Sequence, residues 1–132
     1  MVDTNVLLDW LLDRDSLRTK LIEDFFASSN HLQVPDVILV ELAFALEKVY
    51  KLPRLIVSEN ITKILDDSLF SCSHNLFHNL LMDYVHHPAL SFVDCYALHY
   101  AAQNKTLPVW TFDKSLVNQS QNRAQLVSRS TV

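Results

Sequence analysis

The stretch MVDTNVLLDWLL (residues 1–12) places an acid, Asp3, between a first hydrophobic pair and a long apolar run. Its first residues fit a short strand, and NVLLDWLL has the apolar density of a helix. Asp3 therefore has two interpretations. It either caps the helix that follows, or it ends a strand and points into a functional site at the edge of a sheet.

The rest of the chain alternates predicted helices with short predicted strands. Strands separated by helices need crossover connections, which build a parallel sheet covered on both faces. We therefore predict a single domain over residues 1–132, an α/β three-layer α/β/α sandwich with a mostly parallel central sheet of four or five strands. After the first strand, the predicted strands are HLQVP (31–35), LFSCS (69–73), LPVWTF (107–112) and AQLVS (124–128), and the predicted helices lie at 5–12, 17–29, 36–50, 53–67, 74–87, 91–104 and 113–120.

The composition excludes several classes of nucleotide-binding enzyme. The 132 residues are 49% hydrophobic, which is typical of a globular chain, but none is glycine. Average usage of about 7% would give roughly nine glycines. A Rossmann fingerprint, a P-loop and a glycine-rich kinase loop all need glycine where the backbone approaches phosphate, so none of them can be present.

The net charge and the targeting signals limit which partners and which cellular location can be expected. The net charge of −4 gives no overall attraction to a polyanion, so a nucleic-acid partner needs a local basic patch or bound metal ions. No apolar run approaches the roughly 18 residues of a membrane span, and no signal peptide is apparent. Two cysteines without a secretory signal favour free thiols in the cytoplasm.

Four acids stand out by their positions. Asp3 and Asp113 each follow a predicted strand, while Glu41 and Asp94 interrupt apolar helical segments. Each also has a structural explanation. Asp94 follows Ser91 by three residues, the spacing of a capping box, Asp113 could cap the helical turn after it, and Glu41 could face solvent.

Taken together, the four acids favour a metal site. Carboxylates gathered at one edge of a sheet repel each other unless a cation neutralises them. Hard oxygen ligands of this kind suit Mg²⁺ or Mn²⁺. Such a pocket is equipped for in-line hydrolysis of a phosphodiester bond.

Four segments together resemble the PIN-domain ribonucleases, in particular the VapC-type toxins of bacterial toxin–antitoxin pairs: DTNVLLDWLL, PDVILVELAFAL, SFVDCYALHYAA and VWTFDKSL. The resemblance implies a catalytic metal, Mg²⁺ or Mn²⁺, on Asp3, Glu41, Asp94 and Asp113. It further implies that Asn5 helps to orient the site, and Thr111 matches the supporting hydroxyl residue two positions before the last acid. The implied activity is endonucleolytic cleavage of RNA, with a small cognate antitoxin and a homodimer as the expected assemblies.

Some alternatives stay open at this stage. Only two residues precede the first acid, so the first strand is expected to be very short or to begin upstream. A phosphotransfer or phosphatase domain would use Asp3 as nucleophile, although Asn5 cannot supply the general acid of such phosphatases. A weak PIN-like domain kept for partner binding is the third possibility. The cations Arg14, Arg18 and Lys20 either line an RNA path or form an ordinary charged surface.

Overall fold

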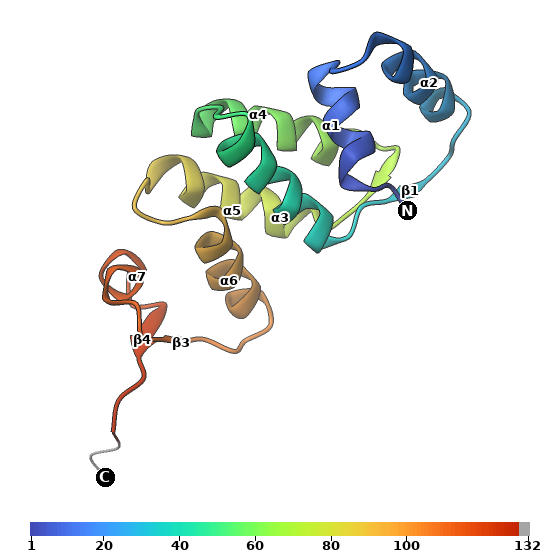
Figure 1. The fold of residues 1–132 in the computed structure, drawn as a ribbon. Coiled ribbons are helices and arrows are strands. Elements are labelled where there is room, and N and C mark those ends of the chain that lie inside the picture. Colours follow the sequence, from blue (N-terminus) through green and yellow to red (C-terminus); the bar gives the residue numbers. More distant parts are fainter. Residues whose placement is uncertain (130–132) are drawn as a thin grey trace. The chain divides into compact units, whose positions relative to one another are not determined.

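A computed structural model of the chain describes residues 1–129, and the chain divides into two compact units, one from Met1 to His74 and the other from Asn75 on (Figure 1). Each unit is described by itself. Within the described residues, no helix combines the length and the apolar character that crossing a membrane requires.

The N-terminal unit is built from helices around one parallel pair of strands. Leu32 pairs with Phe70 and Gln33 with Ser71, as expected for strands joined by a helical crossover. Its elements are α1 (Thr4–Leu12), α2 (Ser16–Ala27), β1 (Leu32–Gln33), α3 (Asp36–Phe44), the π-helix η1 (Ala45–Val49), α4 (Arg54–Leu65) and β2 (Phe70–Ser71).

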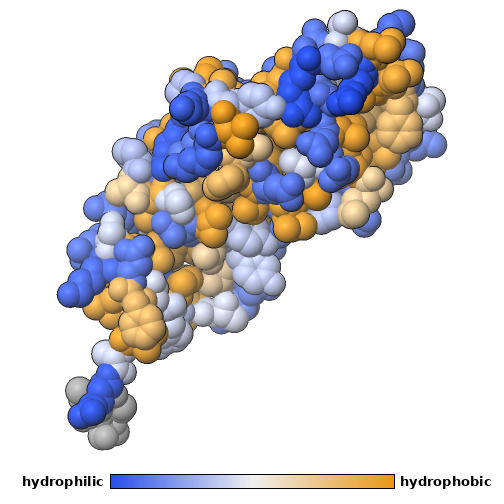
Figure 2. Space-filling view, in the orientation of Figure 1, coloured by the Kyte–Doolittle hydropathy of each residue, from blue (hydrophilic) through white to orange (hydrophobic). Residues whose placement is uncertain are grey.

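Aromatic rings join three elements of this unit. The Trp10 ring centroid on α1 lies 5.3 Å from that of Phe26 on α2 and 5.6 Å from that of Phe70 on β2. Such edge and tilted contacts are favourable beyond the apolar area that they bury. Not all apolar groups of α2 are buried, and on the face in Figure 2 hydrophobic and hydrophilic residues lie side by side over the region of this helix. Its exposed apolar side chains are Leu17, Leu21 and Phe25.

The predicted helix 36–50 changes type in its last turn. The Tyr50 N–H donates to the Ala45 carbonyl at 3.0 Å, a five-residue span that makes η1 a π-helix. Leu46 within it is fully buried. The wider turn continues the helix without a break, so the predicted extent was right and the predicted regular geometry was wrong at its C-terminal end.

The described part of the C-terminal unit has three helices and a second parallel pair of strands. The aromatic rings of Phe77 and Tyr84 on α5 pack against Phe92 on α6, and the Tyr84–Phe92 centroids are 5.1 Å apart. The elements are α5 (His74–His86), which begins at the last residue of the N-terminal unit, α6 (Phe92–Gln103), β3 (Val109–Thr111), α7 (Lys114–Gln119) and β4 (Ala124–Leu126).

The strands are shorter than predicted, at two or three residues each, and they form two separate parallel pairs, β1–β2 and β3–β4. No strand is assigned to the first residues, although the Val2 N–H donates to the Gln33 carbonyl at 3.0 Å. The alternation of helices with parallel strands agrees with the prediction. A central sheet of four or five strands is not seen among the described residues.

Because the chain has no glycine, other residues take the left-handed backbone conformation. Among residues 1–129, five have positive φ, including Asp13 at 49° and Lys105 at 58°. Lys105 follows α6 in a complete Schellman motif, since its N–H donates to the Ala102 carbonyl and the Thr106 N–H donates to the Ala101 carbonyl. A side chain with a Cβ is strained in this conformation.

Replacing Lys105 with Gly should therefore stabilise the protein. Relief of the left-handed strain should exceed the extra chain entropy, giving a gain of about 1 kcal/mol in the free energy of unfolding measured with denaturant. Lys105→Ala is the control, because it removes the charge but keeps the Cβ. Equal stability of the two variants would contradict the strain at this position.

Candidate functional site

Asp3 lies at the N-cap of α1 but does not use its side chain as a cap. Its carbonyl accepts hydrogen bonds from the Val6 and Leu7 N–H groups at 3.1 and 3.4 Å, while its carboxylate makes no capping bond. The side chain is exposed, and the residue before it is hydrogen bonded to β1. The capping interpretation therefore does not account for the acid at this position.

Glu41 lies on α3, which packs against α1. Its neighbours Leu39 and Leu42 are fully buried, whereas Glu41 is exposed. No ion pair of Glu41 occurs in the described part of the chain. Glu41 therefore faces solvent, which was the structural explanation considered for it. Its carboxylate is accessible to a ligand.

Asp94 takes part in the predicted capping box at the start of α6. Its carboxylate accepts from the Ser91 N–H at 3.0 Å, and the Ser91 hydroxyl accepts from the Asp94 N–H at 3.0 Å. The side chain is half-buried. One of its oxygens is thereby oriented by the helix start, which does not prevent the carboxylate from binding a cation.

Asp113 caps α7, and Thr111 in turn supports Asp113. The Asp113 carboxylate accepts from the Ser115 and Leu116 N–H groups at 2.9 and 3.1 Å. The Thr111 hydroxyl accepts from the Asp113 N–H at 3.0 Å. Asp113 thus caps the helix, as one of its two interpretations predicted. Thr111 holds the backbone N–H of this acid in place.

The four acids are divided equally between the two units. Asp3 and Glu41 lie in the N-terminal unit, and Asp94 and Asp113 lie in the C-terminal unit. Over residues 1–129, neither unit gathers three or more His, Cys, Asp or Glu side chains in a group that could hold a metal ion. Each unit thus contains one pair of the predicted acids.

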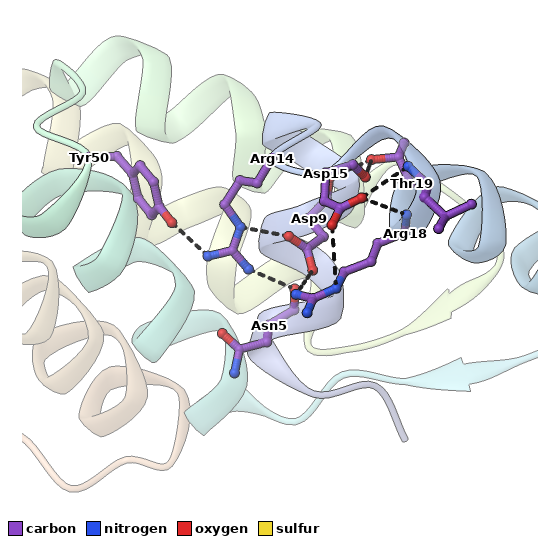
Figure 3. A network of polar contacts seen from close by, with 8 residues as sticks. Asn5, Asp9, Arg14, Asp15, Arg18, Thr19 and Tyr50 are labelled. Atoms are coloured by element: carbon purple, nitrogen blue, oxygen red, sulfur yellow. Dashed lines mark hydrogen bonds and ion pairs between the residues drawn. The ribbon is translucent and has the colours of Figure 1, made fainter.

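A network around Asp9 in the N-terminal unit was missed in the sequence (Figure 3). The Asp9 carboxylate is buried and lies 2.7 Å from Arg14 Nε. Arg14 also donates to the Tyr50 hydroxyl at 2.6 Å and to the Asn5 carbonyl at 3.3 Å. Its bonds to Tyr50 and then to Asp9 raise the pKa of Arg14. Arg14 therefore holds α1 to the end of η1, and its place along an RNA path stays a prediction.

Arg18 is also directed at Asp9, with Nη1 3.7 Å from the carboxylate. Asn5 exposes its side chain and contributes its carbonyl to the Arg14 network (Figure 3). The sequence signal for this network was Asp9 itself, an acid inside an apolar run, five residues before an arginine.

A second network, around Asp83, joins elements of the C-terminal unit. Asp83 Oδ2 on α5 accepts from Arg123 Nη1 at 2.7 Å and lies 2.5 Å from His99 Nε2 on α6. His87 Nδ1 is 3.2 Å from the other carboxylate oxygen. Burial alone would raise the pKa of Asp83, but the hydrogen bonds from Arg123 and His99 hold it below its ordinary value. The carboxylate is therefore ionised and cross-links α5, α6 and the turn before β4.

The part of the chain that carries all four acids matches a known protein family. The family model described as PIN domain matches residues 1–120. This chain belongs to the PIN-domain family. The resemblance predicted from the sequence is confirmed, and so is the α/β class, since the PIN domain is an α/β fold.

A curated relative supports a particular branch of the PIN family. A VapC ribonuclease from Aquifex aeolicus (strain VF5) is 36% identical over 75 residues. These residues make up 54% of this chain and 55% of the relative, so this PIN protein spans about half the length of the curated relative that it matches. No solved structure matches the chain significantly.

Removing the charge of Asp83 should destabilise this PIN protein. Asp83→Asn loses charged hydrogen bonds from Arg123 and His99, which should lower the free energy of unfolding by about 2 kcal/mol at neutral pH. Because the folded-state pKa of Asp83 is lowered, its stabilisation is complete above the unfolded pKa of about 3.9 and is lost as the pH falls below it. Urea titrations from pH 7 to pH 3 measure both effects.

The matched control is Asp24→Asn, which removes an exposed carboxylate from α2. It should leave stability nearly unchanged at every pH. A gap between the wild type and Asp83→Asn that stays constant down to pH 3 would contradict the lowered pKa of Asp83.

Proposed function

We propose that this PIN-domain protein is a metal-dependent endoribonuclease, the toxin of a toxin–antitoxin pair, and that Asp3, Glu41, Asp94 and Asp113 together hold Mg²⁺ or Mn²⁺. The observation that carries the proposal is the PIN-domain match over residues 1–120, which contains all four acids. The similarity to a VapC ribonuclease supports RNA as the substrate. We further propose that both units form one domain around a central parallel sheet of four or five strands.

The donor set fits a hard divalent cation. All four groups are carboxylates, the ligands that Mg²⁺ and Mn²⁺ prefer. Asp3 is the most telling of them, because it occupies a capping position and leaves its carboxylate out of the cap. Asp94 and Asp113 make hydrogen bonds at the starts of α6 and α7, respectively. These bonds would hold the two carboxylates in defined orientations.

A cation bound by these acids would offset the charge of the phosphodiester and increase the acidity of a water molecule. The chain's own groups have supporting tasks. Asp94 and Asp113 are oriented by Ser91 and by Thr111, respectively. In the overall reaction the water oxygen attacks phosphorus, the bond to the 3′ oxygen breaks, and that oxygen takes up a proton. The products are a 3′-hydroxyl and a 5′-phosphate.

The acids can be tested without disturbing the fold. Asp3→Asn keeps an N-cap residue of equal quality but removes one charge from the proposed cation site. Loss of groups that only support a metal ligand costs about 10–100-fold, so loss of a ligand should lower RNA cleavage at least about 100-fold. Mg²⁺ should raise the melting temperature of the wild type and lose this effect in the variant.

Asp13→Asn at the other end of α1 is the matched control. It removes the same charge from an exposed residue whose left-handed backbone Asn tolerates. Glu41→Gln, Asp94→Asn and Asp113→Asn should behave like Asp3→Asn. If Asp3→Asn cleaves RNA at the wild-type rate with an unchanged Mg²⁺ effect, the nuclease assignment fails.

We propose that the cognate antitoxin binds the N-terminal helices. Leu17, Leu21 and Phe25 form an exposed stripe at helical spacing on α2, with exposed fractions of 72, 63 and 52%. The Trp10 ring borders a neighbouring cavity of about 410 Å³. Exposed apolar residues in such a row suit the apolar face of a partner helix. We also propose a homodimer, and a cytoplasmic location consistent with the free Cys72 and Cys95.

The stripe can be tested with the proposed antitoxin, which we expect to be the product of a short reading frame next to this gene. Leu21→Asp should weaken its capture of that product at least about 30-fold, the effect of losing a residue that contributes 2 kcal/mol, with RNA cleavage unchanged. The control Val93→Asp changes an exposed apolar residue of α6 and should have no effect on capture. Equal loss in both variants would contradict a binding surface on α2.

A further inference from the structure

Arg14 lies just beyond the C-terminal end of α1, and its side chain runs back along that helix (Figure 3). Its three guanidinium nitrogens have three different partners. Nε lies 2.7 Å from an Asp9 carboxylate oxygen, Nη1 donates to the Tyr50 hydroxyl at 2.6 Å, and Nη2 donates to the Asn5 carbonyl at 3.3 Å. Because the guanidinium is planar and rigid, the positions of these three partners are coupled to one another.

The Asp9 carboxylate anchors this guanidinium. The Asp9 side chain is 8% exposed and that of Arg14 is 28% exposed. A buried carboxylate is costly unless it is paired, so Asp9 strongly favours the observed position of Arg14. The other cation near this carboxylate is held more loosely, because Arg18 Nη1 is 3.7 Å away and the Arg18 side chain is 66% exposed.

The contacts of Arg14 join the two elements that carry the predicted acids of the N-terminal unit. Asn5 lies in the first turn of α1, two residues after Asp3. Tyr50 follows η1, which continues α3, the helix that carries Glu41. The guanidinium therefore links the start of α1, beside the first acid, to the end of the helical segment that carries the second.

These hydrogen bonds add direction to the packing of α1 against α3. Both helices contribute fully buried leucines, Leu7 and Leu39, respectively. Burial of apolar groups has little directional preference, whereas the strength of a hydrogen bond falls steeply as its angle departs from the optimum. The three contacts of Arg14 therefore restrict sliding and rotation of α1 along α3.

We propose that Arg14 is a positioning residue for the proposed metal site, and that it sets the relative position of Asp3 and Glu41. The inference rests on the metal-dependent function proposed above and adds a residue that would act through the ligands without touching the metal. Divalent cations such as Mg²⁺ tolerate little departure from octahedral geometry, at ligand distances of about 2.0–2.1 Å. A small shift of α1 along α3 would therefore lower metal affinity in a protein that is still folded.

The test measures Mn²⁺ binding to the whole chain by isothermal titration calorimetry, without RNA. Arg14→Lys keeps the charge beside Asp9 but replaces the three-way fork with a single ammonium group. Its dissociation constant for Mn²⁺ should be at least about 10-fold above that of the wild type, the lower end of the effect of losing a group that orients a metal ligand. Tyr50→Phe removes one hydroxyl and leaves the ion pair, so it should raise the constant by a smaller factor.

The matched control is Arg18→Lys, which changes an exposed arginine that faces the same carboxylate from α2. It should leave the Mn²⁺ dissociation constant unchanged. Melting temperatures of all variants without metal separate a loss of stability from a loss of metal affinity. A role of Arg14 in stability alone would lower the melting temperature and leave the dissociation constant at the wild-type value.

An unchanged constant in folded Arg14→Lys overturns the positioning role while the proposed metal site stands. If Arg14→Lys does not fold, Tyr50→Phe decides in its place, and an unchanged constant there overturns the role. An equal rise in Arg18→Lys also overturns it, because any change beside Asp9 would then suffice. A wild type that binds no Mn²⁺ removes the proposed metal site itself, and the positioning role with it.

Discussion

The hydrogen bond from the Val2 N–H to the Gln33 carbonyl is the contact on which the N-terminal part of the site depends. It holds the first residues beside β1, so that Asp3 comes where β1 ends and α1 begins. Bonds from the Leu32 and Val34 N–H groups to the Leu69 and Ser71 carbonyls hold β1 to β2 in turn. Strands of two residues have few such bonds, so the loss of a single bond would change the local backbone geometry.

Helix capping and metal binding are compatible uses of the same acids. Asp94 and Asp113 cap their helices through backbone N–H groups, and these bonds fix the direction in which each carboxylate projects. A carboxylate has acceptor positions on both oxygens, so a cap leaves capacity for a cation. Asp3 differs because its backbone carbonyl alone serves the helix. The cap at Asp3 therefore does not need an acid.

Local sequence patterns predicted the features that depend on neighbours in the chain. The three-residue spacing of Ser91 and Asp94 indicated the capping box, and apolar spacing indicated the helices. Contacts between distant residues were not predictable in this way. Asp83, His99 and Arg123 are separated by 16 and 24 residues, and only packing brings them together. The length of each strand likewise depends on the partner strand available, which the chain's own pattern does not specify.

The net negative charge of the chain limits how it could bind the proposed RNA substrate. Arg14 and Arg18 are directed at Asp9, and Arg123 at Asp83, so each of these arginines has a carboxylate partner within its own unit. With a net charge of −4, non-specific attraction to the RNA backbone is weak. For the proposed RNA substrate, affinity would therefore depend on a cation held by the carboxylates, because such a cation presents positive charge to the phosphates.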